Sequence, residues 1–371
     1  MRYYIIAGEA SGDLHASNLV KHLKANDEHA VFRGWGGDKM QEKGVDLVKH
    51  YRDLAFMGFT EVLLNLKTII NNLEFCKKDL IEWQPDVIIL VDYPGFNLRI
   101  ASFAHKKGLK VFYYISPQIW AWKQSRVHQI KRDVDAMFVI LPFEQEFYRR
   151  FGMEVYFEGH PLADALKEEA TYSEGPITEG RNKHIALLPG SRKQEIQTML
   201  PEMIKAVKMN TEWEATIAGV SSVGIEFYKQ IIGKENITIE FNKTYELLRK
   251  SDAALVTSGT ATLEAGLIGV PTVVCYKGGR ISYYIARQLI KVKYISLVNL
   301  MLNREAVTEL IQHKMNARNL YHELDGLLNN EQRRLKMKRD LNELKNICGE
   351  PGASARIAQK MTELLKRKTA E

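Results

Sequence analysis

Asp92 ends the most apolar run of the chain and is a candidate for acid–base chemistry. Ile88-Ile89-Leu90-Val91 precede it without polar alternation, and Tyr93-Pro94-Gly95 follow it as a turn. An uninterrupted aliphatic run of this kind is typical of a strand buried on both faces of a parallel sheet. Open α/β sheets bind their ligands at the carboxyl ends of such strands. Asp92 could therefore act as a base, although an aspartate at this place also commonly caps the next turn.

Polar loops follow other predicted strands of the first half in the same way. The loop after the first strand holds two glycines, which predicts either close approach of a substrate to the backbone or a tight turn. A second loop, after the strand at 110–115, carries two tryptophans spaced by one, and we expect such a pair to line a cleft. A histidine ends a further strand, where ligand-facing and capping roles are equally open. These candidates are Gly8, Glu9, Ser11, Gly12, Asp13, Ser116, Gln118, Trp120, Trp122 and His160.

Two strand–loop–helix segments in the second half are candidate anion sites. Glycine lets a ligand approach the backbone, and the first amides of a helix attract negative charge. Arg192 adds a forked cation to the first segment, and Glu264 stands one turn into the second helix, within reach of ribose hydroxyls. Capping of the helix by Ser or Thr is the alternative. The predicted diphosphate-binding residues are Gly190, Ser191, Arg192, Ser258, Gly259, Thr260, Thr262 and Glu264.

Composition excludes several classes of protein. The chain has 371 residues with a formal net charge of +7, and 45% of them are hydrophobic, as in a globular protein with full cores. Its three cysteines are far apart and form no CxxC, and no histidine pair has metal-ligand spacing, so we expect no disulfide framework and no metal. The basic balance suits an anionic partner, but no nucleic-acid-binding signature accompanies it. The start Met1–Gly8 indicates a strand, and no run reaches the roughly 18 apolar residues of a membrane span, so we expect a cytoplasmic protein.

Strand-like runs alternate with helix-length segments, which predicts parallel α/β sheets. The polar stretch 168–183 carries Gly175-Pro176 and Gly180 and is the best linker. We therefore predict two doubly wound domains facing each other across a cleft. The expected boundaries are 1–167 for the first domain, 168–183 for the linker, 184–348 for the second and 349–371 for a C-terminal helix. From about residue 303 the chain is expected to be helical to its end.

Apolar residues recur at helical spacing from Phe59 to Leu73. The ordinary interpretation is a helix that faces the core. A membrane-contacting helix is the alternative, because Leu54-Ala55-Phe56-Met57 add apolar bulk before it. The membrane-facing candidates are Phe56, Met57, Phe59, Leu63, Leu66 and Ile70.

Motifs along nearly the whole chain resemble the lipid-A-disaccharide synthase family, inverting glycosyltransferases of the GT-B architecture. Two of them, AGEASGD (7–13) and SPQIWAWK (116–123), are highly specific to that family. The others are MGFTEVL (57–63), VDYPGFN (91–97), LPFE (141–144), GHPLAD (159–164), LLPGSR (187–192), SGTATLE (258–264) and SLVNLML (296–302).

The resemblance implies two Rossmann-like domains and a defined reaction. A 2,3-diacylglucosamine would pass from UDP to the 6-hydroxyl of 2,3-diacylglucosamine 1-phosphate, with inversion and release of UDP. Asp92 would be the general base, valued mainly for its position because an ordinary carboxylate is a weak base. The first-domain candidates and Asn97 would line the acceptor site, and Asn299 would join the nucleotide contacts. No cofactor or metal is implied.

The resemblance also implies partners. Acylated substrates would bring the protein to the inner membrane surface, through the 54–73 segment and the basic excess. A homodimer, formed through exchanged C-terminal segments, is implied as well. The sequence departs from the family pattern at two positions. Gly95 replaces a second carboxylate found in some members, so we expect no shared-carboxylate mechanism. Val298 replaces a proline. A nucleotide-sugar 2-epimerase and a non-catalytic nucleotide-binding protein are the rival interpretations.

Overall fold

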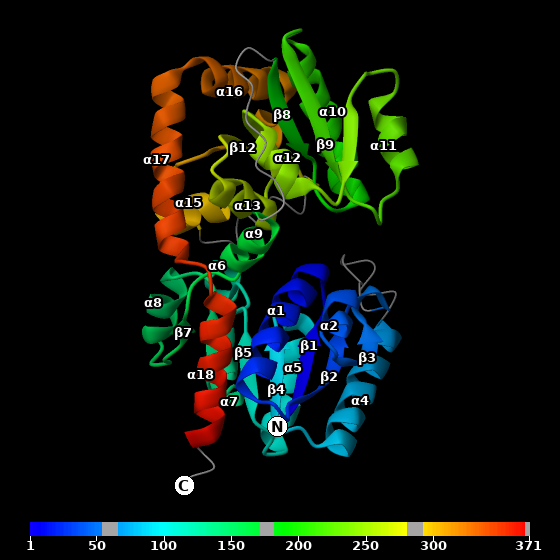
Figure 1. Cartoon of the computed structure of the whole chain (residues 1–371), viewed down its shortest axis with the longest axis vertical. Coiled ribbons are helices and arrows are strands. Elements are labelled where there is room, and N and C mark those ends of the chain that lie inside the picture. The colour runs from blue at the N-terminus through cyan, green and yellow to red at the C-terminus, as the bar shows by residue number, and fades with distance from the viewer. Residues whose placement is uncertain (54–65, 171–181, 280–291, 368–371) are drawn as a thin grey trace. The chain divides into compact units, whose positions relative to one another are not determined.

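The computed structural model describes residues 1–53, 66–170, 182–279 and 292–367. These residues form two compact units, the first made of Met1–Asp164 with Gly349–Glu371 and the second of Ala165–Cys348. Each unit is a parallel sheet with helices on both faces (Figure 1), as the alternating pattern predicts. The predicted linker differs in detail, because α9 (Leu162–Ala170) includes 168–170 and β8 already begins at Lys183. Residues 171–181 lie outside the described part.

The first sheet has seven strands in the order β3-β2-β1-β4-β5-β6-β7, all paired in parallel. Its strands are β1 (Arg2–Ala7), β2 (Val31–Gly36), β3 (Asp46–His50), β4 (Val87–Val91), β5 (Val111–Tyr114), β6 (Ala136–Val139) and β7 (Tyr156–Phe157). The helices of this unit are α1 (Ala10–Asn26), α2 (Asp38–Glu42), α4 (Leu66–Trp83), α5 (Pro94–Lys106), α6 (Ile119–Trp122), α7 (Arg126–Asp133), α8 (Phe143–Arg149) and α18 (Ala353–Arg367), with a 3-10 turn, η1, at Tyr51–Asp53.

The second sheet has six strands in the order β10-β9-β8-β11-β12-β13, also parallel. Its strands are β8 (Lys183–Leu188), β9 (Trp213–Gly219), β10 (Thr238–Phe241), β11 (Ala253–Thr257), β12 (Thr272–Tyr276) and β13 (Thr308–Ile311). Its helices are α10 (Lys193–Lys208), α11 (Ile225–Ile232), α12 (Thr244–Lys250), α13 (Thr260–Ile268), α15 (Leu297–Leu302), α16 (Ala317–Asn329) and α17 (Glu331–Cys348), with a 3-10 turn, η2, at Gln312–Lys314.

The sequence analysis did not predict two of the strands. β3 (Asp46–His50) was not expected, and β13 (Thr308–Ile311) shows that the expectation of an all-helical chain from residue 303 was wrong. Both lie at the edge of their sheets. Edge strands are short and are not buried on both faces, so they lack the continuous aliphatic pattern that marks the central strands.

Alternate residues of β1 face different helices of the first unit. Tyr3, Ile5 and Ala7 belong to a core cluster with residues of α1 and α18, such as Leu19 and Ile357. Tyr4, one residue out of phase, bonds instead to Asp79 of α4. α1 and α18 therefore cover one face of the sheet, and α4 covers the other (Figure 1).

The C-terminal helix returns to the first unit, where it packs along α1. The Asp164 carboxylate caps its start by accepting bonds from the amides of Gly352 and, at 2.8 Å, Ser354. Arg356 then donates to the carbonyl of Glu158 at 2.7 Å. These contacts tie the two chain segments of the unit to each other.

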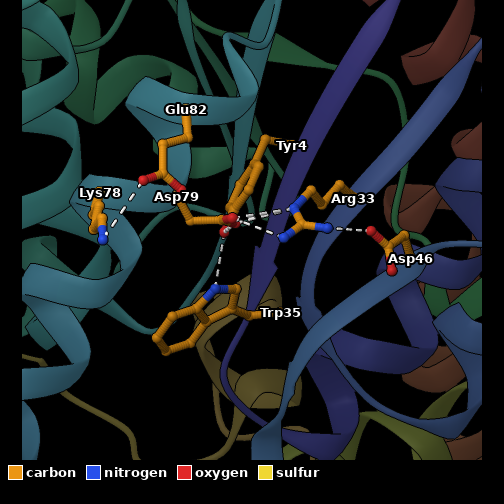
Figure 2. A network of polar contacts seen from close by, with 7 residues as sticks. All are labelled: Tyr4, Arg33, Trp35, Asp46, Lys78, Asp79 and Glu82. Atoms are coloured by element: carbon orange, nitrogen blue, oxygen red, sulfur yellow. Dashed lines mark hydrogen bonds and ion pairs between the residues drawn. The ribbon is translucent and has the colours of Figure 1, made fainter.

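A polar network fastens α4 to the sheet (Figure 2). Tyr4 donates to Asp79 at 2.7 Å and accepts from the Trp35 indole at 2.9 Å. Arg33 donates to both oxygens of Asp79, at 2.8 and 3.1 Å, and also pairs with Asp46. Asp79 thus provides the hydrogen-bond acceptor for both the Tyr4 hydroxyl and the Arg33 guanidinium.

Asp79→Ala should lower the free energy of unfolding by about 2–4 kcal/mol, because the partner groups stay in place without their acceptor. Urea denaturation followed by tryptophan fluorescence measures the change. Glu82→Ala is the matched control on the same helix, since its contact with Lys78 is long, at 3.6 Å, and exposed. We expect it to cost about 0.5 kcal/mol or less. Equal effects of the two substitutions would contradict the role of Asp79.

Candidate active site

The order of the first sheet creates a crevice at the ends of β1 and β4. The chain proceeds from β1 outward to β2 and β3, then returns to β4 and continues toward β7. The loops after β1 and β4 therefore leave in opposite directions, which is where open α/β sheets bind ligands. Gly8-Glu9 follow β1, and Asp92-Tyr93 follow β4. The topology thus brings Glu9 and Asp92 to one place.

The backbone at Asp92 is held in a strained conformation. Asp92 and Tyr93 have φ angles of 46° and 47°, in the left-handed region that non-glycine residues rarely adopt. Such conformations cost about 1–3 kcal/mol each and persist only where neighbours enforce them. Asn97 donates to the Asp92 carbonyl at 2.8 Å, and Tyr113 donates to it at 2.6 Å. Asn97 is fully buried, so its role is to position Asp92 and not to contact an acceptor as predicted.

Burial, together with the negative charge of Glu9, raises the pKa of the Asp92 carboxyl to about 7, although the hydrogen bond from the Tyr93 amide acts in the opposite direction. A base with a pKa near neutrality is well matched to proton transfer at physiological pH. The expectation that Asp92 has an ordinary pKa and acts mainly by position was therefore wrong. Position 95 itself carries no carboxylate, as the sequence analysis noted, but Glu9, in the loop after the neighbouring strand β1, places a negative charge near Asp92.

Glycine at the end of β1 accommodates Tyr93. A Cβ atom at Gly8 would lie 2.3 Å from Cγ of the Tyr93 ring, so any larger residue would displace that ring. The group that lies close to the backbone of this loop is therefore the Tyr93 ring, at the position where the sequence analysis considered a substrate. Gly12 is buried, and Ser11 is exposed at the start of α1.

Asp13 has a structural role that corrects its assignment to the acceptor site. Its side chain is only 3% exposed, and it accepts the amides of Gly37 at 2.7 Å and of Lys39 and Met40 at 3.1 Å. These are the first amides of α2 and of the loop before it. The carboxylate therefore caps α2.

The two tryptophans after β5 divide between core and surface. Trp120 is buried and donates its indole N–H to Glu144 at 3.1 Å, whereas Trp122 is 50% exposed. Ser116 is buried with its hydroxyl 2.8 Å from that of Tyr148, and Gln118 is exposed. Of this loop, Gln118 and Trp122 are therefore open to a ligand, and the cleft prediction for Trp120 and Ser116 was wrong.

Glu144 was missed by the sequence analysis, although it ends the LPFE motif. It is buried, and it accepts the Leu141 amide at 3.0 Å as well as the Trp120 indole. Burial raises its pKa to about 7 against these hydrogen bonds, which lower it. Both of its oxygens are used inside the fold, so Glu144 positions Trp120.

His160 also has a structural role. It is 2% exposed, and its Nδ1 accepts the Leu162 amide at 3.1 Å. Burial, together with the nearby His15, lowers its pKa to about 3. His160 is therefore a neutral capping residue, which resolves the choice between capping and ligand contact.

In the second unit the same reversal of strand order places the loops after β8 and β11 side by side. The first loop is already occupied by a carboxylate, because Glu195 accepts the amides of Ser191 at 3.1 Å and Arg192 at 3.3 Å. These amides are not open to a phosphate in this structure, contrary to prediction. Glu195 also crowds Gly190, whose hypothetical Cβ would lie 2.6 Å from the Glu195 carboxylate. The side chain of Arg192 is 58% exposed and remains accessible.

The loop after β11 is more open. Gly259 and Thr260 are exposed, and a Cβ built on Gly259 meets no heavy atom within 4 Å. Ser258 and Thr262 donate to backbone carbonyls, those of Ile295 at 3.1 Å and Gly259 at 2.8 Å. Their hydroxyls therefore shape the loop. Glu264 is half-buried and accepts the Tyr245 hydroxyl at 3.2 Å.

Asn299 is completely buried, and its prediction as a nucleotide contact was wrong. Its Nδ2 donates to the Val307 carbonyl at 2.8 Å and to Glu309 at 2.9 Å. Its Oδ1 accepts the amides of Ala306 at 2.8 Å and Val307 at 3.0 Å. The side chain has no hydrogen-bonding capacity left for a ligand, so it fixes the loop between α15 and β13.

The predicted membrane-facing residues are mostly outside the described part of the chain. Phe56, Met57, Phe59 and Leu63 lie there, and the side chain of Leu66 at the start of α4 does too. Ile70 is 56% exposed on α4. No helix within the described ranges is long and apolar enough to cross a bilayer. Those ranges also hold no group of three or more His, Cys, Asp or Glu arranged to bind a metal.

A family model described as lipid-A-disaccharide synthetase matches residues 3–361. The match covers both units and every motif discussed above. The chain belongs to this family. Its members are enzymes, and the motif residues at Glu9 and Asp92 occupy the crevice of the first unit.

Curated relatives extend over nearly the full length. The lipid-A-disaccharide synthase of Syntrophus aciditrophicus is 39% identical over 98% of this chain and 97% of its own length. That of Myxococcus xanthus is 38% identical with the same coverage, 98% and 97%.

Solved structures confirm the predicted GT-B fold. A UDP-GlcNAc 2-epimerase from Neisseria meningitidis superposes with a TM-score of 0.69 at 12% identity, covering 98% of this chain and 100% of its own. A calicheamicin glycosyltransferase gives 0.63 at 15% identity, with 99% coverage of both chains. Likeness at such identity shows the architecture alone.

Glu9→Gln should move the acidic limb of the pH–rate profile to lower pH. Removing the negative charge beside Asp92 lowers the pKa of that carboxyl from about 7, so the basic form persists further into acid. The dependence of kcat/KM on pH between 5 and 9 measures the shift. Glu158→Gln, outside the crevice, is the control and should leave the limb in place. If the acidic limb does not move in Glu9→Gln, the charge of Glu9 does not raise the pKa of Asp92.

Proposed function

We propose that Asp92 is the general base of a glycosyl transfer between two acylated glucosamines. Family membership makes the chain a UDP-sugar-dependent glycosyltransferase that forms the lipid A disaccharide. The observation that carries the role of Asp92 is its raised pKa of about 7 beside Glu9, at the switch point of the first sheet. A half-buried carboxylate with a pKa near neutrality is suited to take a proton from a sugar hydroxyl.

The reaction proceeds by direct displacement. Asp92 takes the proton of the 6-hydroxyl of 2,3-diacylglucosamine 1-phosphate as that oxygen attacks the anomeric carbon of UDP-2,3-diacylglucosamine. The new carbon–oxygen bond forms on the face opposite UDP, so the bond to the diphosphate breaks with inversion. The strained backbone at Asp92 and Tyr93, fixed by Asn97 and Tyr113, keeps the carboxylate in place for this step.

Negative charge on the departing diphosphate needs stabilisation in the second unit. The exposed start of α13 at Gly259 and Thr260 supplies helix amides, and the exposed Arg192 side chain supplies a cation. We propose that the diphosphate binds these groups and that the enzyme needs neither a metal nor another cofactor. For the amides of Ser191 and Arg192 to join them, Glu195 would have to turn away.

Asp92→Asn should lower kcat at least about a hundredfold, because the amide cannot accept the proton. The purified protein is incubated with both substrates in detergent micelles containing EDTA, and the disaccharide phosphate is followed by mass spectrometry. UDP affinity, measured by calorimetry, should stay within about twofold. Asp53→Asn, an exposed position, is the matched control and should leave kcat unchanged.

Two results would contradict the assignment. Turnover of Asp92→Asn within a few-fold of the unaltered enzyme would exclude Asp92 as the base. Activity that disappears in EDTA and returns with magnesium would exclude the metal-free mechanism.

The enzyme is further proposed to work at the inner membrane surface of the cytoplasm. Both substrates carry acyl chains, and α4 exposes Ile70, Phe75 and Ile81 by 56%, 49% and 43%. Exposed apolar side chains together with the net charge of +7 favour reversible binding to anionic lipid. We also propose a homodimer that exchanges its C-terminal segments. In that dimer, the α18 helix of the second copy would pack on α1 in place of the chain's own α18.

Ile70→Ser should weaken binding to phosphatidylglycerol vesicles about threefold or more, with little change in thermal stability, because the side chain is already exposed. Vesicle co-sedimentation and a melting curve measure the two effects. Leu73→Ser, one turn further on the same helix and 8% exposed, should instead lower the melting temperature. Unchanged vesicle binding by Ile70→Ser would exclude this part of α4 from the membrane contact.

A further inference from the structure

An exposed aromatic–cationic cluster, formed by Trp122, Lys123 and Arg126, follows β5 in the first unit. Trp122 is 50% exposed, the Arg126 guanidinium lies 5.4 Å from the centre of its ring, and the Lys123 ammonium lies 5.9 Å from it. Among the residues that the structure describes, no carboxylate forms an ion pair with either cation. Stacking on an indole holds a guanidinium in place while leaving its N–H groups available.

The register of two neighbouring helices places the cluster near the start of α5, the helix that follows Asp92. Gln129 of α7 donates to the Leu98 carbonyl of α5 at 3.0 Å. Both helices follow strands of the same parallel sheet and so run in the same direction. One turn before Gln129 is Arg126, and one turn before Leu98 is the Pro94-Gly95 start of α5. Arg126 is therefore level with the residues that directly follow Asp92.

Electrostatics within the first unit agree with this placement. The positive charge of Arg126 lowers the pKa of Tyr113 against the effect of burial. Tyr113 is the residue whose hydroxyl donates to the Asp92 carbonyl at 2.6 Å. Arg126 is therefore close enough to act on the residue that holds the Asp92 turn.

We propose that Arg126, held by Trp122 and assisted by Lys123, binds the 1-phosphate of the sugar acceptor. The proposal rests on the proposed function, in which the acceptor 6-hydroxyl reaches Asp92. The anomeric phosphate is attached to the same sugar ring, so a cation near the start of α5, the helix that follows Asp92, is placed to receive it. An arginine fork matches phosphate oxygens with two parallel hydrogen bonds.

The carboxylates of the crevice make such a cation necessary. Asp92 and Glu9 are both acidic groups, and a phosphate dianion brought close to them would be repelled. Arg126 and Lys123 offset that repulsion without neutralising Asp92. The donor diphosphate has other proposed partners, Arg192 and the start of α13.

A phosphate could also come from a lipid head group, since tryptophan flanked by basic residues suits a membrane interface. The position near the helix that follows Asp92 favours the acceptor, because the proposed reaction requires the acceptor sugar to reach Asp92, whereas a bulk lipid head group has no such requirement. If the cluster binds the acceptor, substituting Arg126 changes the KM for the acceptor. If it binds lipid head groups, the substitution changes binding to vesicles instead.

Arg126→Ala should raise the KM for the acceptor about tenfold or more, with the KM for the UDP-sugar within twofold. Initial rates are measured in neutral detergent micelles that contain no anionic lipid. Arg126→Lys, which keeps the charge but loses the fork, should give a smaller increase. The matched control is Arg2→Ala, which removes an arginine stacked 4.6 Å over Trp83 at the other end of the same sheet. It should change neither KM.

A second acceptor, 2,3-diacylglucosamine without its phosphate, isolates the contact. The unaltered enzyme should use it at least about tenfold less efficiently, and Arg126→Ala should lose that preference while using the dephosphorylated acceptor as before. Equal losses on both acceptors, or a raised KM for the UDP-sugar, would overturn the proposal. So would weaker binding of Arg126→Ala to phosphatidylglycerol vesicles with an unchanged acceptor KM, which would assign the cluster to lipid head groups.

Failure of this inference is distinguishable from failure of the proposed function. An unaltered enzyme that forms no disaccharide from the two substrates would refute the function itself. An unaltered enzyme that forms disaccharide, with Arg126→Ala showing the same acceptor preference, would refute only the role of Arg126.

Discussion

The position of one carboxylate, Asp92, at the switch point of the sheet is the constraint on which the first unit depends. The parallel sheet reverses its strand order between β1 and β4, and Asp92 lies at this switch point, where open α/β sheets bind ligands. Burial there raises the pKa of Asp92, and Glu9, brought in by the neighbouring strand, also raises it. A group that would be an indifferent base in water becomes one matched to neutral pH.

Neighbouring residues stabilise the strained backbone that holds Asp92 in this position. Two successive residues adopt left-handed backbone angles, and the Asp92 carbonyl takes hydrogen bonds from Asn97 and Tyr113. Gly8 leaves room for the Tyr93 ring that follows. Several polar side chains that look like substrate contacts are therefore supports: Asn97 holds the strained turn, Asp13 caps α2 and His160 caps α9.

The second unit repeats the topology with different chemistry. Its reversal, between β8 and β11, brings two helix starts together, which suits an anion and not a base. In the loop after β8, Glu195 satisfies the amides itself, so a carboxylate of the chain stands where an anionic ligand would bind. The loop after β11 is kept open by Gly259. In the proposed function, proton transfer and charge stabilisation therefore belong to separate sheets.

The sequence alone determined the fold class, the central strands and the place of Asp92. Continuous aliphatic runs mark buried parallel strands, and the residue after such a run must lie at the ligand-binding edge. Edge strands such as β3 and β13 carry no such pattern, and they were missed. The family motifs likewise located the loops that surround both switch points.

Only the tertiary structure decided what each polar side chain does. Whether Asn299 meets a nucleotide or satisfies four backbone and side-chain partners depends on contacts with Val307 and Glu309, which the local sequence does not encode. The pKa of Asp92 depends on Glu9, more than eighty positions away in the chain but next to it across β1 and β4. Motif and periodicity report local geometry, whereas burial and charge are set by residues that meet only when the sheet forms.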